Sequence, residues 1–287
     1  MRINGRDIGP GHEPYVIAEV SANNNGTLGR ALELIRKAKE AGADSVKLQL
    51  YDPMKLAIAR GGPDKKLASG PWAGRTLLDL YTEGHTPREW FPAMFDYAKK
   101  HNITLFSSVF DDDGVDFLET LNCPCLKIAS FELTNLPLIR KAASTGKPII
   151  LSTGMGDYDN IAATLYDARE SGAGDLAALH CVSAYPCPAD QANLARINLL
   201  QSFSFDAVGF SDHTLGHECA IAAVALGACI IEKHITLDRN DGGLDASFSM
   251  EPAEFKAMVS AIRNVHAALQ PPKGDGEAIY RELRSKS

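Results

Sequence analysis

The feature that most constrains the fold of this chain is a regular alternation of short apolar runs with longer segments of helical periodicity. Such alternation is typical of parallel strands connected by helices, an α/β architecture. Eight apolar runs are predicted as strands, at Tyr15–Val20, Ser45–Leu50, Thr104–Val109, Cys125–Ala129, Pro148–Ser152, Leu176–Cys181, Ala207–Ser211 and Ile230–His234. Eight strands of this kind predict one closed (β/α)8 barrel, a TIM barrel, for which 287 residues suffice.

Helices are predicted between these strands. The segment Leu28–Ala41 carries apolar residues at helical spacing on one face, and Gly42 then ends the helix. Similar helices are expected at Pro87–Lys100, Gly114–Thr120, Leu136–Thr145, Ile161–Ser171, Gly216–Leu226 and Pro252–Leu269, with a short one around Asn198–Ser202.

Three segments fall outside the repeating pattern. An Asn4-Gly5 pair between short apolar segments predicts an N-terminal β-hairpin that closes the N-terminal mouth of the barrel. The long connection from Tyr51 to His85 is rich in Gly, Pro and Lys, and it is either an active-site insertion or a mobile surface loop. We expect one catalytic barrel domain over residues 1–270, followed at 271–287 by a polar tail that frays or by the start of a linker.

Composition narrows the class of protein. With 45% hydrophobic and 23% charged residues the chain is an ordinary globular protein, and its net charge of −7 gives no basic surface for nucleic acid. No run approaches the ~20 apolar residues that span a membrane, and the N-terminus has no secretory pattern. Six cysteines without metal-binding spacing indicate a reducing, cytoplasmic location.

Polar side chains gather at the predicted strand ends. In such barrels the active site lies at the C-terminal ends of the strands. Residues spaced two apart, such as Lys47 and Gln49 or Glu232 and His234, project to the same face of a strand. The polar residues at or just after the strand ends are Glu19, Lys47, Gln49, Ser107, Ser108, Lys127, Ser130, Glu132, Ser152, Thr153, His180, Ser183, Tyr185, Ser211, Asp212, His213, Glu232, Lys233 and His234.

Two lysines within strands indicate an anionic substrate. Lys47 and Lys127, together with hydroxyls and backbone amides at the turns, suit a ligand that carries phosphate or phosphate and carboxylate. Either lysine alone is better interpreted as a surface residue whose stem lies along an apolar edge. The presence of both on different strands favours a binding role.

Two histidines end neighbouring strands. His213 and His234 are predicted to converge on one divalent metal, for which Mn²⁺, Fe²⁺, Co²⁺ and Zn²⁺ are all suitable. Glu232 is then a candidate acid or base beside the metal. Either histidine alone is better interpreted as a hydrogen-bonded structural residue, whereas the pair favours metal binding. His180, next to Cys181, is interpreted as a core histidine.

These residues lie in segments that resemble the sialic acid synthases, which condense phosphoenolpyruvate with an amino-sugar aldehyde. The resemblance extends from Pro14 to about Leu269. Its motifs, in order, are VIAEVSANNNG, GADSVKLQ, KIASFELTNLPLI, GKPIILSTGM, HCVSAYP, GFSDHTLG and EKHITLDR.

Within this family the chain is most similar to the pseudaminic acid synthase branch. The motifs LDLYTEGHTPREW and LDRNDGGLDASFSMEP carry that similarity. The implied acceptor is 2,4-diacetamido-2,4,6-trideoxy-altrose. Legionaminic acid synthase is the sibling alternative, and N-acetylneuraminic acid synthase is a more distant one.

The resemblance also implies roles for individual residues. Mn²⁺, with Mg²⁺ or Co²⁺ as alternatives, would bind His213 and His234. Glu19 and Glu232 would act on the reacting carbons. The implied phosphoenolpyruvate pocket consists of Lys47, Ser108, Lys127, Ser130, Ser183 and Ser211. The residues implied to face the sugar are Gln49, Glu132, Tyr185 and Asp245.

The implied reaction is an aldol-like condensation with C–O cleavage. C3 of phosphoenolpyruvate attacks the open-chain aldehyde, whose oxygen the metal polarises, and water adds at C2 before phosphate leaves. Members of the family usually continue into a small antifreeze-like C-terminal domain and form homodimers. This chain ends at Ser287, about where the linker to that domain would begin, so the sugar site is expected to be incomplete.

Two other interpretations remain open. One is a metal-dependent aldolase or isomerase on the same barrel, which would turn over without phosphoenolpyruvate and would not need Lys47 and Lys127. The other is a non-catalytic barrel that binds phosphoenolpyruvate or a sugar as a sensor or assembly partner, because a shared fold does not guarantee activity.

Overall fold

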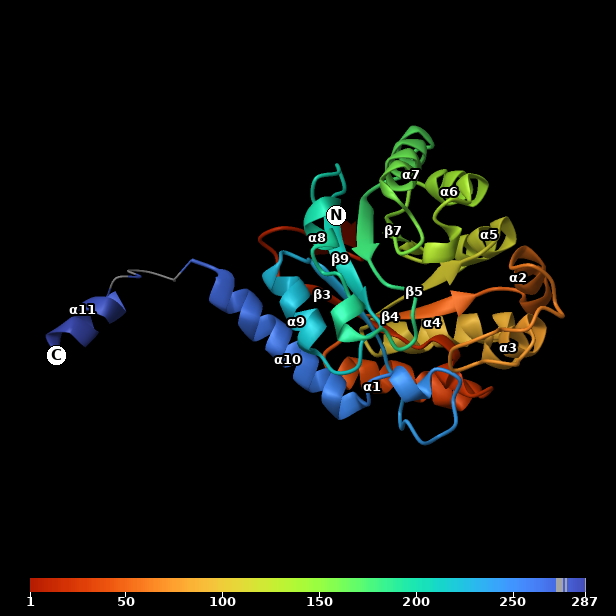
Figure 1. The fold of residues 1–287 in the computed structure, drawn as a ribbon, viewed down its shortest axis with the longest axis horizontal. Coiled ribbons are helices and arrows are strands. Elements are labelled where there is room, and N and C mark those ends of the chain that lie inside the picture. The colour runs from red at the N-terminus through yellow and green to blue at the C-terminus, as the bar shows by residue number, and fades with distance from the viewer. Residues whose placement is uncertain (272–275, 277, 287) are drawn as a thin grey trace.

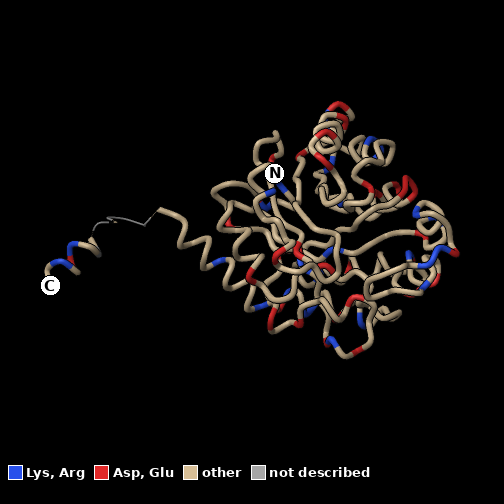
Figure 2. Tube along the Cα trace, viewed as in Figure 1, with Lys and Arg blue, Asp and Glu red and all other residues tan. Residues whose placement is uncertain are grey.

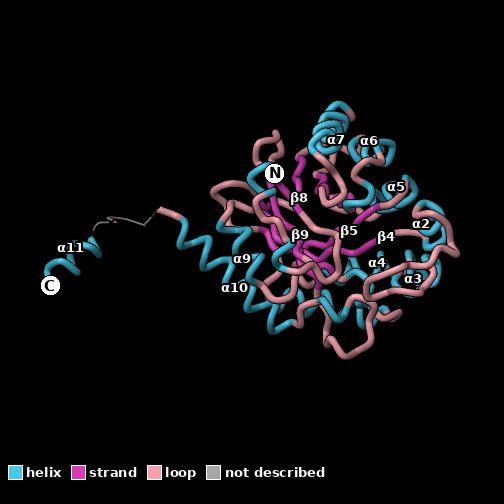
Figure 3. The backbone as a smooth tube through the Cα atoms, in the orientation of Figure 1, coloured by secondary structure: helices cyan, strands magenta, loops and turns pink. Residues whose placement is uncertain are grey.

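Eight parallel strands form a closed barrel surrounded by helices in the computed structural model, which describes residues 1–271, 276 and 278–286 (Figures 1 and 3). The strands follow one another around the barrel in chain order, and the last pairs with the first. They are β3 (Tyr15–Glu19), β4 (Ser45–Leu50), β5 (Thr104–Val109), β6 (Leu126–Ile128), β7 (Ile149–Ser152), β8 (Leu176–His180), β9 (Ala207–Asp212) and β10 (Ile230–His234). The predicted fold is confirmed, and each predicted strand lies within one or two residues of its observed bounds.

The helices pack around the outside of the barrel, as the cyan layer around magenta strands shows (Figure 3). Those of the repeating pattern are α1 (Leu28–Glu40), α4 (Phe91–Lys100), α5 (Asp112–Thr120), α6 (Leu136–Ala143), α7 (Tyr158–Glu170), α8 (Arg196–Leu200), α9 (Glu218–Ala225) and α10 (Pro252–Leu269). Local chemistry fixes several N-termini. The side chains of Thr27, Asp111 and Asp157 each accept a hydrogen bond from the third backbone N–H of the helix that follows.

The predicted N-terminal hairpin is present as β1 (Arg2–Ile3) and β2 (Arg6–Asp7). Asn4 and Gly5 both have positive φ, as a two-residue primed turn requires. The hairpin contacts residues that precede strands or begin them. Arg2 donates its backbone N–H to the Asp175 carboxylate, the Asn4 side-chain amide donates to the Thr104 hydroxyl, and Arg6 forms an ion pair with Asp44. Ile3 and Ile8 are buried. The hairpin therefore lies across the N-terminal mouth of the barrel, as expected.

The barrel interior changes from apolar to polar along the strands. Aligned positions on neighbouring strands share a level, and the register pairs Glu19 with Lys47, Gln49 with Ser108, and Ser108 with Lys127. Nearer the hairpin, the buried side chains are large and mostly apolar, among them Tyr15. The alternation of the strands therefore delivers charged groups to one end of the barrel only.

The long connection after β4 is partly helical, which the sequence analysis did not foresee. It contains α2 (Pro53–Ala59) and α3 (Leu77–Gly84), and a bridge pairs Lys66 with Thr76 between them. Asp52 caps α2 and Thr76 caps α3. Both helices lie together at one side of the barrel (Figure 1). This connection, residues 51–85, is called the insertion below.

The C-terminal segment, predicted as a tail or the start of a linker, contains a helix. After α10, which packs against α9, the chain forms a further helix, α11 (Ala278–Ser285), away from the barrel (Figure 1). Of the predicted tail, residues 272–275, 277 and 287 lie outside the described residues.

Among the helices the structure describes, none is long and apolar enough to cross a membrane. Basic and acidic residues are interspersed along the trace (Figure 2).

Candidate active site

A cavity of about 320 Å³ opens at the C-terminal ends of the strands. That volume is at the lower end of the range for small-molecule sites. Every barrel strand except β8 contributes a lining residue of its own, and Cys181, directly after β8, lines the cavity in its place. The predicted site residues that line the cavity are Glu19, Lys47, Gln49, Ser108, Lys127, Ser130, Ser183, Tyr185, Ser211, His213, Glu232, His234 and Asp245.

A cluster of buried charges occupies the deep end of this cavity. The Lys47 ammonium lies 2.7 Å from the Glu19 carboxylate and 2.9 Å from that of Glu232. Lys127 is 3.7 Å from Glu232. All four side chains are at most 5% exposed. Buried charges are costly unless paired, so two lysines and two carboxylates balance each other here.

Hydroxyls complete the cluster. Lys127 donates to the Ser152 hydroxyl at 2.6 Å, and Ser211 donates to Glu232 at 3.0 Å. The Ser108 hydroxyl is buried and has no hydrogen-bond partner in the part of the chain that the structure describes. Because an unpaired buried hydroxyl is unfavourable, Ser108 is placed to bind a ligand atom or water.

The charges in the cluster shift one another's pKa values. Burial alone would raise the pKa of Glu232, but Lys127 and Lys47 hold it at about 2. Burial lowers the pKa of Lys47 to about 8, against the opposing effect of Glu232. At neutral pH Glu232 is therefore ionised. Lys47 is positively charged, although burial disfavours that charge.

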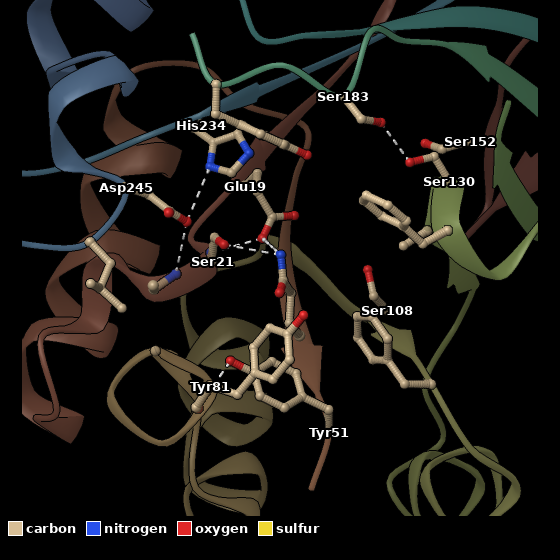
Figure 4. Close-up of a pocket in the computed structure, with 18 of the residues that line it drawn as sticks. Glu19, Ser21, Tyr51, Tyr81, Ser108, Ser130, Ser152, Ser183, His234 and Asp245 are labelled. Atoms are coloured by element: carbon tan, nitrogen blue, oxygen red, sulfur yellow. Dashed lines mark hydrogen bonds and ion pairs between the residues drawn. The ribbon is translucent and has the colours of Figure 1, made fainter. Parts of the chain in front are cut away.

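A serine pair forms another part of the wall. The Ser130 and Ser183 hydroxyls lie 2.8 Å apart, and Figure 4 shows them facing one another across the cavity from Glu19. Ser130 begins the short 3₁₀ helix η3 (Ser130–Glu132) after β6, and Ser183 follows β8. Two strand ends thus bring hydroxyls to one point.

The two histidines at the ends of β9 and β10 come together as predicted. The His213 and His234 ring centroids are 5.6 Å apart. The His213 Nδ1 atom hydrogen-bonds the Val182 carbonyl at 2.8 Å, which assigns the proton to Nδ1 and leaves Nε2 as a lone-pair donor. His234 Nδ1 is buried without a hydrogen-bond partner and lies 3.8 Å from an Asp245 oxygen (Figure 4).

Both imidazoles are suited to bind a metal ion. Burial lowers the pKa of His213 to about 4 and that of His234 well below its usual value, so both rings are neutral at pH 7. Neutral imidazole is the form that binds metals. Within the described part of the chain, no group of three His, Cys, Asp or Glu residues gathers at one point. The two rings offer two nitrogen ligands, so a divalent ion held here would take its other ligands from substrate or water.

Polar contacts fix the wall beside His234. Gln49 donates to the Ser21 hydroxyl at 3.0 Å, and Glu19 accepts the Ser21 backbone N–H at 2.8 Å (Figure 4). Asp245 accepts from the backbone N–H of Ala22, and burial raises its pKa. These contacts tie the turn after β3 to the loop after β10.

Glu132 is the one predicted site residue that does not line the cavity. Its side chain is behind the wall and forms an ion pair with Arg60, which does line the cavity. Burial raises the pKa of Glu132 to about 7 although Arg60 opposes the shift. The sequence analysis placed Glu132 against the sugar and overlooked Arg60, which lies in the insertion without a recognisable motif.

The insertion supplies a whole wall of the cavity. Of the two alternatives, an active-site insertion and a mobile surface loop, the structure therefore supports the first. Trp72 contributes its ring, which lies 5.7 Å from the Tyr185 ring, and donates its indole N–H to the Leu244 carbonyl. Tyr185 in turn lies 4.3 Å from the His213 ring. The insertion residues that line the cavity are Tyr51, Leu56, Arg60, Leu67, Trp72, Leu77, Leu80, Tyr81 and Gly84.

Other strand-end polar residues serve the fold. His180 is buried, hydrogen-bonds the Ala192 carbonyl and stacks on Phe210, which confirms its interpretation as a core histidine. Lys233 and Asp212 form a buried ion pair at 2.8 Å and do not line the cavity. Their positions alternate with Glu232 and Ser211, which do line it.

The chain is similar to known proteins over most of its length. Residues 34–273 match the profile of the NeuB family. Pseudaminic acid synthase of Helicobacter pylori is 41% identical over 257 residues, which cover 89% of this chain and 75% of that protein. N,N'-diacetyllegionaminic acid synthase of Campylobacter jejuni is 38% identical over 270 residues, which cover 91% of this chain and 78% of that protein.

Solved structures agree with these sequence comparisons. The crystal structure of N-acetylneuraminic acid (sialic acid) synthetase from Leptospira borgpetersenii, in complex with citrate, superposes with a TM-score of 0.87. The two chains are 30% identical, and the match covers 100% of this chain and 95% of the other.

Proposed function

The chain belongs to the NeuB family, and on this premise we propose that it is a nonulosonic acid synthase, which condenses phosphoenolpyruvate with an acetamido sugar and releases phosphate. The family resemblance found in the sequence motifs is confirmed. The observation that carries the proposal is the convergence of Lys47 and Lys127 on Glu232 at the deep end of the cavity. Few ligands other than a compact polyanion would suit such a site.

The deep cluster is the proposed phosphoenolpyruvate pocket. Lys47 and Lys127 supply positive charge for the phosphate and carboxylate groups. The hydroxyls of Ser108, Ser130, Ser183 and Ser211 add donors around them. In the free protein, Glu19 and Glu232 neutralise the lysine charge, and the bound anion would take over part of that role.

In the proposed reaction, C3 of phosphoenolpyruvate attacks the aldehyde carbon of the open-chain sugar and forms the new C–C bond. C2 then carries cationic character and takes up the oxygen of a water molecule. The tetrahedral centre at C2 collapses by breaking its bond to the phosphate oxygen, and inorganic phosphate leaves. Holding the two carbons together at the deep end supplies the proximity contribution.

The carboxylates have distinct proposed roles. Glu19 lies beside Lys47 and would accept a proton from the attacking water. Glu232 stays ionised because Lys127 and Lys47 depress its pKa, and it would stabilise positive charge that develops at C2.

His213 and His234 are the residues that would hold a divalent metal, for which we propose Mn²⁺, with Mg²⁺ or Co²⁺ as alternatives. The bound ion would supply Lewis acidity at the aldehyde oxygen. The hydrogen bond from His213 to Val182 would hold its ring in the metal-binding tautomer.

We propose 2,4-diacetamido-2,4,6-trideoxy-altrose as the acceptor, which would make the chain a pseudaminic acid synthase. Support comes from the sequence motifs of that branch and from the 41% identity to its Helicobacter pylori member. Gln49, Tyr185 and Asp245 lie on the side of the cavity where the sugar would bind. A legionaminic acid acceptor is the alternative, given the 38% identity to that synthase.

Location, assembly and domain extent complete the proposal. The six cysteines are buried and unpaired, in keeping with a reducing, cytoplasmic location. A homodimer and a catalytic domain over residues 1–270 are proposed from the family resemblance.

The first test is phosphate release from phosphoenolpyruvate by the purified chain with Mn²⁺, with the altrose derivative and with N-acetylmannosamine in parallel. Release with the altrose derivative alone supports a pseudaminic acid synthase. Release with neither sugar, despite measurable phosphoenolpyruvate binding, contradicts a pseudaminic or N-acetylneuraminic acid synthase. The legionaminic acid acceptor is then offered, and its failure favours a binding protein. Turnover of a sugar without phosphoenolpyruvate would instead indicate an aldolase or isomerase.

A further inference from the structure

The wall that the insertion contributes to the cavity carries one formal charge. Among the insertion residues that line the cavity, Arg60 is charged and the rest are apolar, aromatic or glycine. Arg60 is the C-cap of α2, directly after Ala59. Its side chain is 19% exposed, which places the guanidinium at the boundary between the wall and the open cavity.

Two neighbours hold this guanidinium in place. Arg60 Nη2 donates to Glu132 Oε1, and the Arg60 Cζ atom lies 4.3 Å from the centre of the Phe131 ring. Both neighbours belong to η3, which begins with Ser130 of the proposed phosphoenolpyruvate pocket. A guanidinium fixed by a carboxylate and an aromatic ring has little rotamer freedom left to lose when it binds a ligand.

Arg60 retains hydrogen-bonding capacity. A guanidinium has five N–H groups, and Glu132 is the acceptor for Arg60 within the part of the chain described. Glu132 has a second carboxylate oxygen, Oε2, that is buried without a partner. The pair is therefore incompletely satisfied, which is typical of groups that await a ligand.

The distribution of charge indicates what kind of ligand atom Arg60 would meet. The deep end holds Lys47 and Lys127, where an anion is favoured. On the wall formed by the insertion, the positive charge of Arg60 is already balanced by its ion pair with Glu132. An uncharged acceptor oxygen suits this wall better than a second phosphate does.

We propose that Arg60 is an acceptor-binding residue that donates hydrogen bonds to the carbonyl oxygen of a sugar acetamido group. Glu132 is then a positioning residue that acts through Arg60. The inference rests on the proposed function and deepens it, because it names the group of the second substrate that the insertion recognises.

The test measures sugar binding directly, by calorimetry with phosphoenolpyruvate present, and in parallel the steady-state KM values for both substrates. The sugars are 2,4-diacetamido-2,4,6-trideoxy-altrose and its two analogues in which one acetamido group is replaced by hydroxyl. We expect Arg60→Met to weaken binding of the diacetamido sugar about 10- to 100-fold, the usual effect of losing a charge-assisted hydrogen bond. The KM for phosphoenolpyruvate should stay within about twofold.

The analogues and further variants identify the contact. For one of the two hydroxyl analogues, the affinity of the wild-type protein should be as low as the affinity of Arg60→Met for the diacetamido sugar. The same analogue should bind Arg60→Met no more weakly than it binds wild type. Arg60→Lys should recover part of the affinity. Glu132→Gln should weaken sugar binding in the wild-type background and add nothing in Arg60→Met, as expected of a residue that acts through Arg60.

Arg75→Met is the matched control. Arg75 lies in the same insertion and pairs with Glu83 at 2.6 Å, but it does not line the cavity. Unchanged affinity for the diacetamido sugar in Arg60→Met overturns the inference about Arg60 while leaving the proposed function intact. Wild type that binds none of these sugars overturns both. If wild type bound a 6-phosphorylated hexosamine more tightly than the diacetamido sugar, and Arg60→Met did not, the proposed contact between Arg60 and an uncharged oxygen would be contradicted.

Discussion

The Lys47 ammonium lies 2.9 Å from the Glu232 carboxylate although 185 residues separate the two in the chain. Their strands, β4 and β10, are not neighbours, because β3 lies between them. Closure of the barrel and the register of three strands therefore bring the two charges together. Once closed, the barrel holds both charges away from water, and each depends on the other.

We expect Glu232→Gln to destabilise the fold. Removing this carboxylate leaves Lys47 and Lys127 as buried cations with fewer partners, and breaking a buried pair typically costs about 3–5 kcal/mol in the free energy of unfolding. Urea denaturation at pH 7 measures the loss. The control is Asp116→Asn, which removes an exposed ion pair with Lys141 and should leave the unfolding midpoint unchanged.

Lys127→Met should weaken the use of phosphoenolpyruvate. The lysine is 2% exposed and hydrogen-bonds Ser152 at the deep end of the cavity. Loss of one charge-assisted contact predicts a rise of about 10- to 150-fold in the KM for phosphoenolpyruvate. Initial rates of phosphate release at saturating sugar give this value. An unchanged KM would remove Lys127 from the pocket, and Lys141→Met on α6 serves as a surface control.

His234→Gln should abolish stoichiometric binding of Mn²⁺ and metal-dependent turnover without unfolding the protein. The buried His234 Nδ1 has no hydrogen-bond partner, and its ring faces that of His213. Calorimetric titration of the chelator-treated protein with Mn²⁺ measures binding, and circular dichroism checks the fold. His12→Gln, an exposed histidine before β3, should bind as wild type does. Wild-type rates for His234→Gln in metal-stripped buffer would refute the assigned role.

Stability should fall as the pH drops below neutral. An unfolded imidazole takes up a proton near pH 6.5, whereas burial lowers the pKa of His213 in the folded protein to about 4. Between these values the unfolded state binds more protons, so the free energy of unfolding decreases as pH falls. From pH 6.5 to 5 the contribution of His213 is about 2 kcal/mol. Urea denaturation in chelator should show a smaller pH dependence for His213→Asn.

Gly209→Ala should destabilise the barrel because no space exists for a side chain. An added Cβ would lie 2.3 Å from the Ile230 carbonyl oxygen and 2.7 Å from a Leu179 methyl group. Overpacking of this kind costs about 1–3 kcal/mol. Thermal unfolding provides the comparison with Gly29→Ala in α1, where an added Cβ would meet nothing within 4 Å. Equal melting temperatures for the two variants would contradict the close approach.

The barrel could be predicted from the sequence because its determinants are local. Each strand is a short apolar run, and the two-residue alternation alone places Lys47 and Gln49 on the inner face. Strand order around a barrel then follows from chain order. Most of the candidate site could be predicted for the same reason, because the C-terminal ends of the strands meet at one mouth of the barrel.

The conformation of the insertion could not be predicted in this way. Trp72 is anchored by the Leu244 carbonyl, 172 residues away, and no local pattern encodes that contact. Glu132 lies in η3, which follows β6 directly, so the strand periodicity does not give the direction of its side chain, and its place against the sugar stays a prediction from the resemblance. Arg60 was overlooked because its role depends on Glu132 and Phe131, which only the fold brings near it.

The hairpin at the N-terminal mouth has a kinetic consequence. With Ile3 and Ile8 buried beneath it, the barrel is blind-ended, and every molecule enters and leaves by the rim near Trp72. A substrate whose place is at the bottom, against Lys127, must arrive before one that binds nearer the rim. If the proposed reaction takes place here, we therefore expect ordered addition, with phosphoenolpyruvate binding before the sugar. A sugar bound too early would obstruct the passage, and substrate inhibition by the sugar is the expected result.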